Sequence, residues 1–534
     1  MSLQALPSEL DTVILSHLNM RDKCHMTMVS KYYRRIGEPL LYERVCLWTD
    51  EDDRIKHLLL TLLQRDDLRP FVKQFRLRQQ VGVSPEPLPQ LTDRIRYRGD
   101  PDGAQLSESI WAQAPTIRNL LADLSSRYDV SAEFRMIWFA KVLELFPLFD
   151  GALSLLLCLI TKVSDITLEF SSDQPIPITL EILGAIEWNV AQDDDQDEPF
   201  RHLKSLCVTD TGLRKCSYPL RISPGLRHLF IKGNCDPYLY WPHEPPVGTN
   251  TLRMLSLYDV DIDPQYLLDA LRSSWLSNLE DLTLNGVGCG DPLNEQERPW
   301  LSFDYSLLKQ AMLEHLPKLK CFICLDMVSY LSDTPDLISF GSFGAFSQLR
   351  ILSIDLDLLL SREYLQTFED GTTDMNALSG YFLQTLEVLD IGQLEWFVVE
   401  GMFIAYLALC DDEPRAGDEI QQSLAALPVK TIRFSINLFG WYQPEGPSAP
   451  PECWIDEPAV HVLRDMADAL HSLGTTLEVS YQMDQAGRRR PLVLPGFTAE
   501  AVYFDDYEDR RNEAIRDEVA DDASESDNHD GSQD

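Results

Sequence analysis

The sequence predicts a mixed α/β fold, in which three short N-terminal helices precede an irregular solenoid built on a parallel sheet. Three observations predict this fold class. Apolar residues recur at helical spacing near the N-terminus, and after residue 50 strand-like runs alternate with helix-like runs. The strand-like runs also share one apolar pattern at irregular intervals. Strands that alternate with helices favour a parallel sheet with crossover helices.

The composition is that of a folded protein with an unusual charge. The 534 residues are 44% hydrophobic and 25% charged, which excludes wholesale disorder. The 46 Lys and Arg residues against 85 Asp and Glu residues give a net charge of −39. Because phosphate binding needs clustered Lys and Arg, this balance disfavours nucleic acid or an anionic membrane as a partner. The most apolar run, 153–160, is shorter than the roughly 20 residues of a membrane span, so it is predicted to be a buried helix.

The N-terminal segment is predicted to form three helices. Leu10, Ile14 and Leu18 fall on one face of the first helix, the second runs through 24–29, and the third runs through 32–36. About 40 residues cannot bury a sufficient core alone. The apolar surface that remains must therefore pack on the rest of the chain or on a partner.

This segment resembles the F-box, in the form common in large fungal F-box proteins. The order and spacing hold from residue 6 to residue 42, although Lys23 replaces a usual Leu and Tyr33 stands near a usual Trp. The matching residues are Leu6-Pro7, Glu9-Leu10, Ile14, Leu18, Asp22, Val29-Ser30-Lys31, Pro39-Leu40 and Leu41-Tyr42. The alternative is a helical cap packed on the rest of the chain.

The resemblance implies that the segment binds a Skp-family adaptor, and through it a cullin-based ubiquitin ligase. The residues that it places at the adaptor interface are Leu6, Pro7, Leu10, Ile14, Leu18, Met28, Val29, Leu40 and Leu41.

The body of the chain repeats the form apolar-x-x-apolar-x-apolar, which predicts strands. The clearest runs are 203–208, 226–231, 252–257, 279–284, 319–324, 349–354, 386–391 and 429–434, with further candidates at 71–77, 166–170 and 477–481. Amphipathic helices are expected after Asp263-Pro264, over 308–316 and over 463–473.

A strand and a helix at an irregular period of about 20 to 45 residues resemble a leucine-rich-repeat solenoid. The Asn typical of that family appears only as Asn234 and Asn437, so a distorted arc with inserted loops is expected. F-box proteins often carry such repeats as their recognition domain. We therefore expect an F-box at 1–45, a leucine-rich-repeat-like recognition domain at 55–485 and a disordered acidic tail at 500–534.

Outward strand positions of the repeat are expected to bind the substrate protein. They provide an aromatic pair, Phe230 and Tyr258, and a row of carboxylates, Asp281, Asp355 and Asp390. Such a row would attract a partner segment rich in Lys or Arg. The alternative is that these are ordinary solvated residues and that the acidic content only keeps the protein soluble.

Residues for catalysis, a metal or a cofactor are not evident, so we expect neither an enzyme nor a cofactor. The 286–290 glycines lack dinucleotide-binding spacing and are interpreted as a repeat turn. Cys321 and Cys324 have no second cysteine pair to complete a zinc site, so they are interpreted as buried structural residues. Eleven cysteines without framework spacing indicate a reducing compartment, cytoplasmic or nuclear.

The sequence therefore predicts the substrate-recognition adaptor of a Skp-cullin-F-box type ubiquitin ligase, which uses protein–protein contacts rather than catalysis. An F-box scaffold acting outside a ligase and a plain repeat-type interaction module are the alternatives.

Overall fold

The chain forms two compact units, which are residues 1–321 with 330–336, and residues 322–329 with 337–534. The computed structural model describes residues 8–48, 52–78, 108–127, 132–143, 150–170, 176–185, 200–210, 216–221, 225–233, 235–240, 251–260, 262–273, 276–287, 303–325, 338–360, 385–395, 429–437, 471, 476–482 and 489–491.

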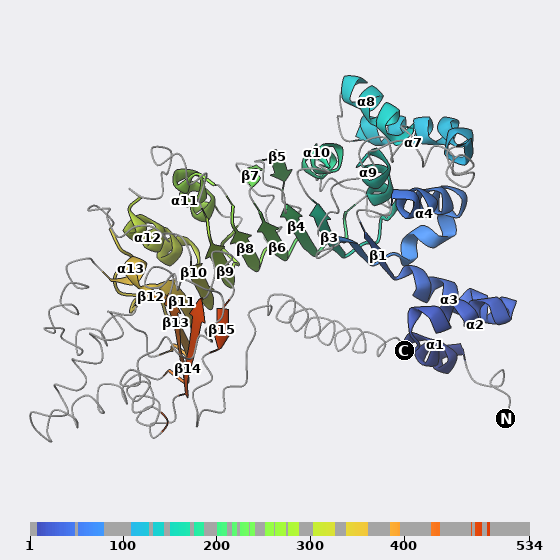
Figure 1. The fold of residues 1–534 in the computed structure, drawn as a ribbon. Coiled ribbons are helices and arrows are strands. Elements are labelled where there is room, and N and C mark those ends of the chain that lie inside the picture. Colours follow the sequence, from blue (N-terminus) through green and yellow to red (C-terminus); the bar gives the residue numbers. More distant parts are fainter. Residues whose placement is uncertain are drawn as a thin grey trace, which may run out of the picture. The chain divides into compact units, whose positions relative to one another are not determined.

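The first unit begins with helices and then alternates helices with strands (Figure 1). Its described helices are α1 (Ser8–Ser16), α2 (Met20–Val29), α3 (Lys31–Tyr42), α4 (Asp52–Gln64), the 3-10 helix η2 (Asp66–Phe71), α7 (Ala114–Arg127), α8 (Ala132–Leu143), α9 (Asp150–Leu159), α10 (Pro177–Ala185), α11 (Pro264–Arg272) and α12 (Tyr305–His315). Its strands are β1 (Arg44–Trp48), β2 (Gln74–Arg78), β3 (Asp165–Phe170), β4 (Ser205–Asp210), β5 (Cys216–Arg221), β6 (His228–Lys232), β7 (Cys235–Tyr240), β8 (Met254–Tyr258) and β9 (Asp281–Asn285).

The boundary between the units falls within β10 (Cys321–Leu325). The second unit then contains β11 (Ile351–Asp355), α13 (Leu356–Leu359), β12 (Val388–Glu395), β13 (Thr431–Asn437), β14 (Thr476–Gln482) and β15 (Arg489–Pro491).

The predicted α/β class with a parallel sheet is confirmed. In the first unit the strands follow the order β1-β2-β3-β4-β6-β8-β9, all parallel, while β5 and β7 form a separate parallel pair. In the second unit β11-β12-β13-β14 are parallel and β15 pairs antiparallel with β14. The sheet begins at Arg44, earlier than residue 55, where the repeat domain was expected to start.

The repeated apolar pattern forms the core because equivalent residues are paired in register. Leu206 lies opposite Leu229, Leu229 opposite Leu255, and Leu255 opposite Leu282. Each of these side chains is buried, and helices α9, α10 and α11 lie on one side of the strands (Figure 1). Burying a Leu or Ile side chain contributes about 1.5–3 kcal/mol to the free energy of folding. These stacked leucines are therefore a main part of the core of the first unit.

Two of the predicted helices form, α11 directly after Asp263 as expected and α12 three residues earlier than the expected start at 308. Asp263 caps α11 by accepting hydrogen bonds from the backbone N–H groups of Gln265 (2.8 Å) and Tyr266 (3.1 Å). In α12 the expected apolar face is buried through Leu308 and Met312. The helix expected over 463–473 lies outside the described residues, apart from residue 471. In the described part of the chain, every helix is too short or too polar to cross a bilayer.

Helices from both sides of β2 and β3 form a packed group around α9. Helix α9 is buried along its whole length, as predicted. Helix α9 contacts α4, α8 and α10, and the indole N–H of Trp138 donates to the hydroxyl of Ser154 at 2.7 Å. The carboxylate of Asp150 accepts hydrogen bonds from the N–H groups of Ile178 (2.7 Å) and Thr179 (2.9 Å) at the start of α10. Burial raises the pKa of Asp150, although these hydrogen bonds oppose the shift.

The Asp150→Ala variant is expected to loosen α10. It leaves two buried N–H groups without their acceptor, which costs about 1–3 kcal/mol. Hydrogen exchange should therefore accelerate at Ile178 and Thr179. Asp304→Ala, which removes the N-cap of α12, is the control and should leave α10 protected. Unchanged exchange at both α10 amides in Asp150→Ala would contradict the capping role.

Candidate functional site

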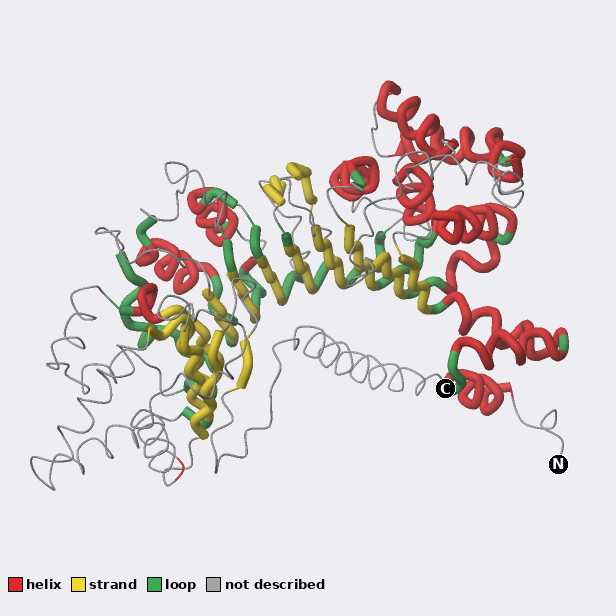
Figure 2. The backbone as a smooth tube through the Cα atoms, in the orientation of Figure 1, coloured by secondary structure: helices red, strands yellow, loops and turns green. Residues whose placement is uncertain are grey.

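The three N-terminal helices are separated by two side-chain caps. Asn19 precedes α2 and accepts a hydrogen bond from the N–H of Asp22 at 2.9 Å. Ser30 ends α2 and begins α3, where its hydroxyl accepts from the N–H of Tyr33 at 3.2 Å. Asn and Ser are preferred caps because they satisfy N–H groups that the first turn leaves unpaired. These two caps therefore account for the division of the segment into three helices, which the sequence predicted (Figure 2).

A small core holds α1, α2 and α3 together. Leu15 and Tyr33 are buried, and the hydroxyl of Tyr32 donates to the carboxylate of buried Asp11 at 2.6 Å. That hydrogen bond raises the pKa of Tyr32 above its ordinary value. A Cβ atom on Gly37 would lie 2.6 Å from Cγ2 of Thr27, so α2 and α3 approach too closely there for any larger residue.

One ion pair, between Glu38 and Arg65, connects this helical segment to the region that follows it. Glu38 of α3 accepts from Arg34 at 2.7 Å and from Arg65, just after α4, at 3.1 Å. Burial alone would raise the pKa of Glu38, but the two guanidinium groups outweigh it and hold that pKa below its ordinary value. Arg65 also pairs with Asp67 at 2.8 Å.

An apolar surface remains exposed on α1 and at the end of α2. The exposed fraction is 49% for Leu10, 52% for Val13 and 44% for Ile14 in α1. It is 74% for Met28 and 68% for Val29 in α2. Isolated exposed apolar residues are common, but Leu10, Val13 and Ile14 lie at i, i+3 and i+4 on one face of α1, and such grouped exposure is typical of interaction surfaces. We call these five residues the apolar patch.

The structure thus places the predicted adaptor-binding residues in three groups. Leu10, Ile14, Met28 and Val29 are exposed, whereas Leu18, Leu40 and Leu41 are half-buried. Leu6 and Pro7 lie outside the described residues. Val13 was not among the predicted interface residues; its place beside Ile14 in an apolar stretch was the available signal.

The two predicted substrate-binding aromatic residues lie together. Phe230 of β6 and Tyr258 of β8 have ring centroids 5.1 Å apart with planes inclined by 36°. Phe230 is buried and Tyr258 is half-buried, so most of the surface that they offer belongs to Tyr258. Asp281, at the start of β9, is half-buried.

The expectation that Asp355 and Asp390 form an exposed carboxylate row is wrong. Each is only 2% exposed. Asp390 accepts a hydrogen bond from the hydroxyl of Ser353 at 2.8 Å and lies opposite Arg433 of β13 in the strand register. Neighbouring parallel strands are about 4.8 Å apart, so the longer side chain of Arg433 is near enough to shield the shorter Asp390 beside it.

Asp390 belongs to a polar row that crosses four strands of the second unit. The row is Ser353, Asp390, Arg433 and Glu478, paired in register. Its far end is an ion pair between Arg433 and Glu478 at 2.6 Å. Asp355 lies two residues further along β11, where a Cβ atom on Gly392 would come within 2.5 Å of its carboxylate. The row therefore serves the packing of the sheet.

The cysteine and glycine interpretations agree with the structure. Cys321 and Cys324 are both buried. Burial, and secondarily the charge of Asp355, raises the pKa of Cys324 well above its ordinary value. Gly286 follows β9 with φ of +63°, a conformation that suits glycine in the expected turn. Within the described ranges, no three His, Cys, Asp or Glu side chains come together as a metal site requires.

No protein-family model matches the chain, and no curated protein matches its sequence. The assignment of function therefore depends on the residues and on the surfaces just described.

The Asp390→Lys variant is expected to destabilise the second unit rather than to change substrate capture selectively. It places an ammonium group at a buried position opposite Arg433 and removes the acceptor of Ser353. Uncompensated buried charges cost about 3–5 kcal/mol. Hydrogen exchange in β11 and β12 should therefore accelerate. Asp281→Lys has the same charge change at a half-buried site and should be tolerated; equal protection in both variants would contradict the burial argument.

The Glu38→Gln variant is expected to lower the thermal stability of the first unit near neutral pH and to have little effect in acid. Because the folded-state pKa of Glu38 is depressed, its contribution is present above the unfolded value, about 4.5, and is lost as the pH falls through the folded value. Melting curves of both proteins across this pH range are the measurement. A stability difference that persists unchanged below the folded pKa would contradict the role of the ion pairs.

Proposed function

We propose that the protein is the substrate-recognition adaptor of a Skp-cullin-F-box type ubiquitin ligase. Helices α1–α3 would bind a Skp-family adaptor, and the sheet region would bind the substrate protein. The observation that carries the proposal is the exposure of the apolar patch. A helical cap packed on its own chain would bury that face, and in the described part of the chain the face is not buried.

The energetics favour a partner on this surface. Each large aliphatic side chain that leaves water on binding contributes about 1.5–3 kcal/mol. Leu10, Ile14 and Val29 would together contribute part of the binding free energy, and they project from helices α1 and α2, which pack on α3. The ion pair between Glu38 and Arg65 adds to the contacts that α3 makes with η2 and β1, the elements that follow it.

The sheet region supports the second half of the proposal. Parallel strands with equivalent residues in register, alternating with helices, are the features expected of a leucine-rich-repeat-like solenoid, which presents a continuous surface to a partner. Holding a substrate beside a ubiquitin-charged enzyme raises the effective concentration of its lysines, so the protein needs no catalytic residues of its own. Such a complex would act in the cytoplasm or nucleus.

The test is co-purification of the Skp-family adaptor with a Leu10→Asp, Ile14→Asp double variant. Two carboxylates in an apolar interface should remove most of the binding, because each would be desolvated without a partner. The control is Thr12→Asp with Ser16→Asp, which has the same spacing and charge change on the opposite side of α1 and should bind at wild-type yield. Wild-type recovery of the adaptor with the Leu10, Ile14 variant would refute the proposal.

The cullin distinguishes the remaining alternatives. Recovery of both adaptor and cullin with the wild-type chain supports the ligase subunit. Recovery of the adaptor without the cullin supports a scaffold outside a ligase, and recovery of neither supports a plain repeat-type interaction module.

A further inference from the structure

The residues that immediately precede the strands of the first unit form a charged row. Lys204, Arg227, Arg253, Glu280 and Lys320 precede β4, β6, β8, β9 and β10 in that order. Backbone hydrogen bonds of 2.7–2.8 Å join each to the next, from the N–H of one residue to the carbonyl of the one before. Because this ladder continues the strand register, equivalent side chains start about 4.8 Å apart.

Three cations are consecutive in this row. Lys204, Arg227 and Arg253 follow one another with no acidic residue between them, and Glu280, next in the row, pairs with Lys320 on its other side. Like charges directly opposite each other on neighbouring strands are unfavourable. The arrangement is unexpected in a chain with 85 acidic residues against 46 basic ones.

At the same position of the repeat, the second unit places a carboxylate between two cations. There the row reads Arg350, Glu387 and Lys430, again joined by backbone hydrogen bonds of 2.7–2.8 Å. Glu387 lies between the two cations and pairs with both, at 3.9 Å from Arg350 and 3.3 Å from Lys430. The uninterrupted cations of the first unit are therefore a local feature and not a consequence of the repeat.

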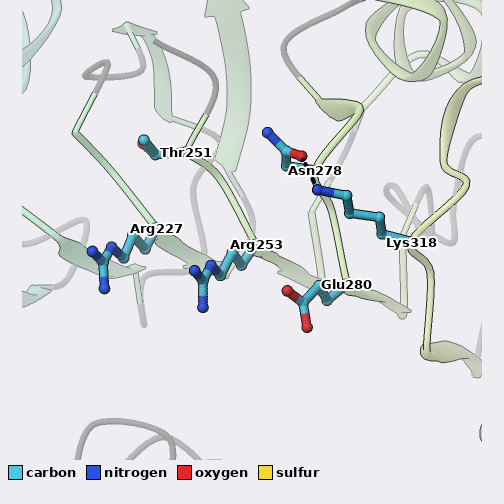
Figure 3. Close-up of a pocket in the computed structure, with 6 residues that line it drawn as sticks. All are labelled: Arg227, Thr251, Arg253, Asn278, Glu280 and Lys318. Carbon is cyan, nitrogen blue, oxygen red and sulfur yellow. Dashed lines mark hydrogen bonds between the residues drawn. The ribbon is translucent and has the colours of Figure 1, made fainter. Parts of the chain in front are cut away.

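A hollow of about 220 Å³ lies beside two of the three cations, Arg227 and Arg253. Its lining residues are Arg227, Thr251, Arg253, Asn278, Glu280 and Lys318. The guanidinium groups of Arg227 and Arg253 are turned the same way, and Lys318 is held by Asn278 at 2.7 Å (Figure 3). Arg253 and Lys318 are exposed and Arg227 is half-buried, so the hollow is open to a partner.

We propose that this basic row, Lys204, Arg227 and Arg253 with the adjoining hollow, binds an acidic polypeptide segment. Guanidinium groups form paired hydrogen bonds with carboxylates. Side chains on one side of an extended segment recur about every 6.6–6.8 Å, within reach of flexible arginines that start about 4.8 Å apart. The partner chemistry is the opposite of the basic segment that the sequence predicted.

The composition of the row and of the hollow favours the carboxylates of a polypeptide over nucleic acid or doubly charged phosphate groups. Nucleic-acid binding combines cations with aromatic side chains on which bases stack, and the six residues that line the hollow include no aromatic one. Glu280 in the lining would repel a doubly charged phosphate more than a single carboxylate. The inference concerns a surface distinct from the apolar patch, so it holds or fails independently of the proposed function.

The experiment measures binding of a fluorescent peptide in which Glu alternates with Ser, using the full chain and fluorescence anisotropy. Affinity should exceed that for the matched Gln peptide and fall as salt is raised, because exposed charges are screened within about 8 Å at physiological ionic strength. Arg227→Glu with Arg253→Glu should weaken binding about tenfold or more. Arg350→Glu with Lys430→Glu has the same charge change and should leave affinity within about twofold.

Three results would overturn the proposal. They are equal affinity for the Glu and Gln peptides, equal losses in the two double variants, and tighter binding of a single-stranded oligonucleotide or a phosphoserine peptide than of the Glu peptide. Arg227→Gln with Arg253→Gln provides a milder change should the reversed charges disturb folding, and circular dichroism checks each variant. The Leu10→Asp, Ile14→Asp variant should bind the peptide as the wild type does, which separates this site from the adaptor surface.

Discussion

The backbone register between neighbouring parallel strands is the constraint on which the other features of this molecule depend. Each strand starts where the previous one starts, because the residue before it donates its N–H to the equivalent carbonyl, as Arg253 does to Arg227. Equivalent positions are thereby stacked in rows about 4.8 Å apart. The burial and the contacts of a side chain then depend less on its own strand than on the equivalent residues beside it in the row. The same register produces the buried leucines, the polar row through Asp390 and the basic row through Arg227.

The sequence predicted the parts of the fold that repeat a local pattern. The apolar spacing located β4, β6 and the strands from β8 to β13, although not β5 and β7. Asp263-Pro264 located the start of α11, because each of these signals lies within a few neighbouring residues. Strand β1 was missed, since it follows a helix directly and its first two residues fell within the F-box expected at 1–45. The group around α9 was predicted only in part, because α8 is apolar over much of its surface and has no distinct face to recognise.

Exposure was the property that the sequence could not supply. The alternation of β11 and β12 correctly assigned Asp355 and Asp390 to the face opposite the leucines. The burial of Asp390 depends on neighbours such as Ser353 and Arg433, which come from other strands. Asp355 lies against Gly392 of β12, again on another strand. The same holds for α1, where Leu15 is 1% exposed and the adjacent Ile14 is 44% exposed. Both residues suit an amphipathic helix, and only the packing of α2 and α3 decides which of them faces water.

The apolar patch and the basic row would bind their proposed partners in two different ways. A patch of aliphatic side chains gains its free energy from burial and is nearly insensitive to salt. A row of cations acts through a field that reaches about 8 Å at physiological ionic strength, so it selects among partners at short range. In a chain of net charge −39, an acidic segment would be repelled by much of the surface and attracted by the consecutive cations of the basic row. The overall negative charge therefore sharpens the selectivity of the row, since it raises the free energy of every misplaced encounter.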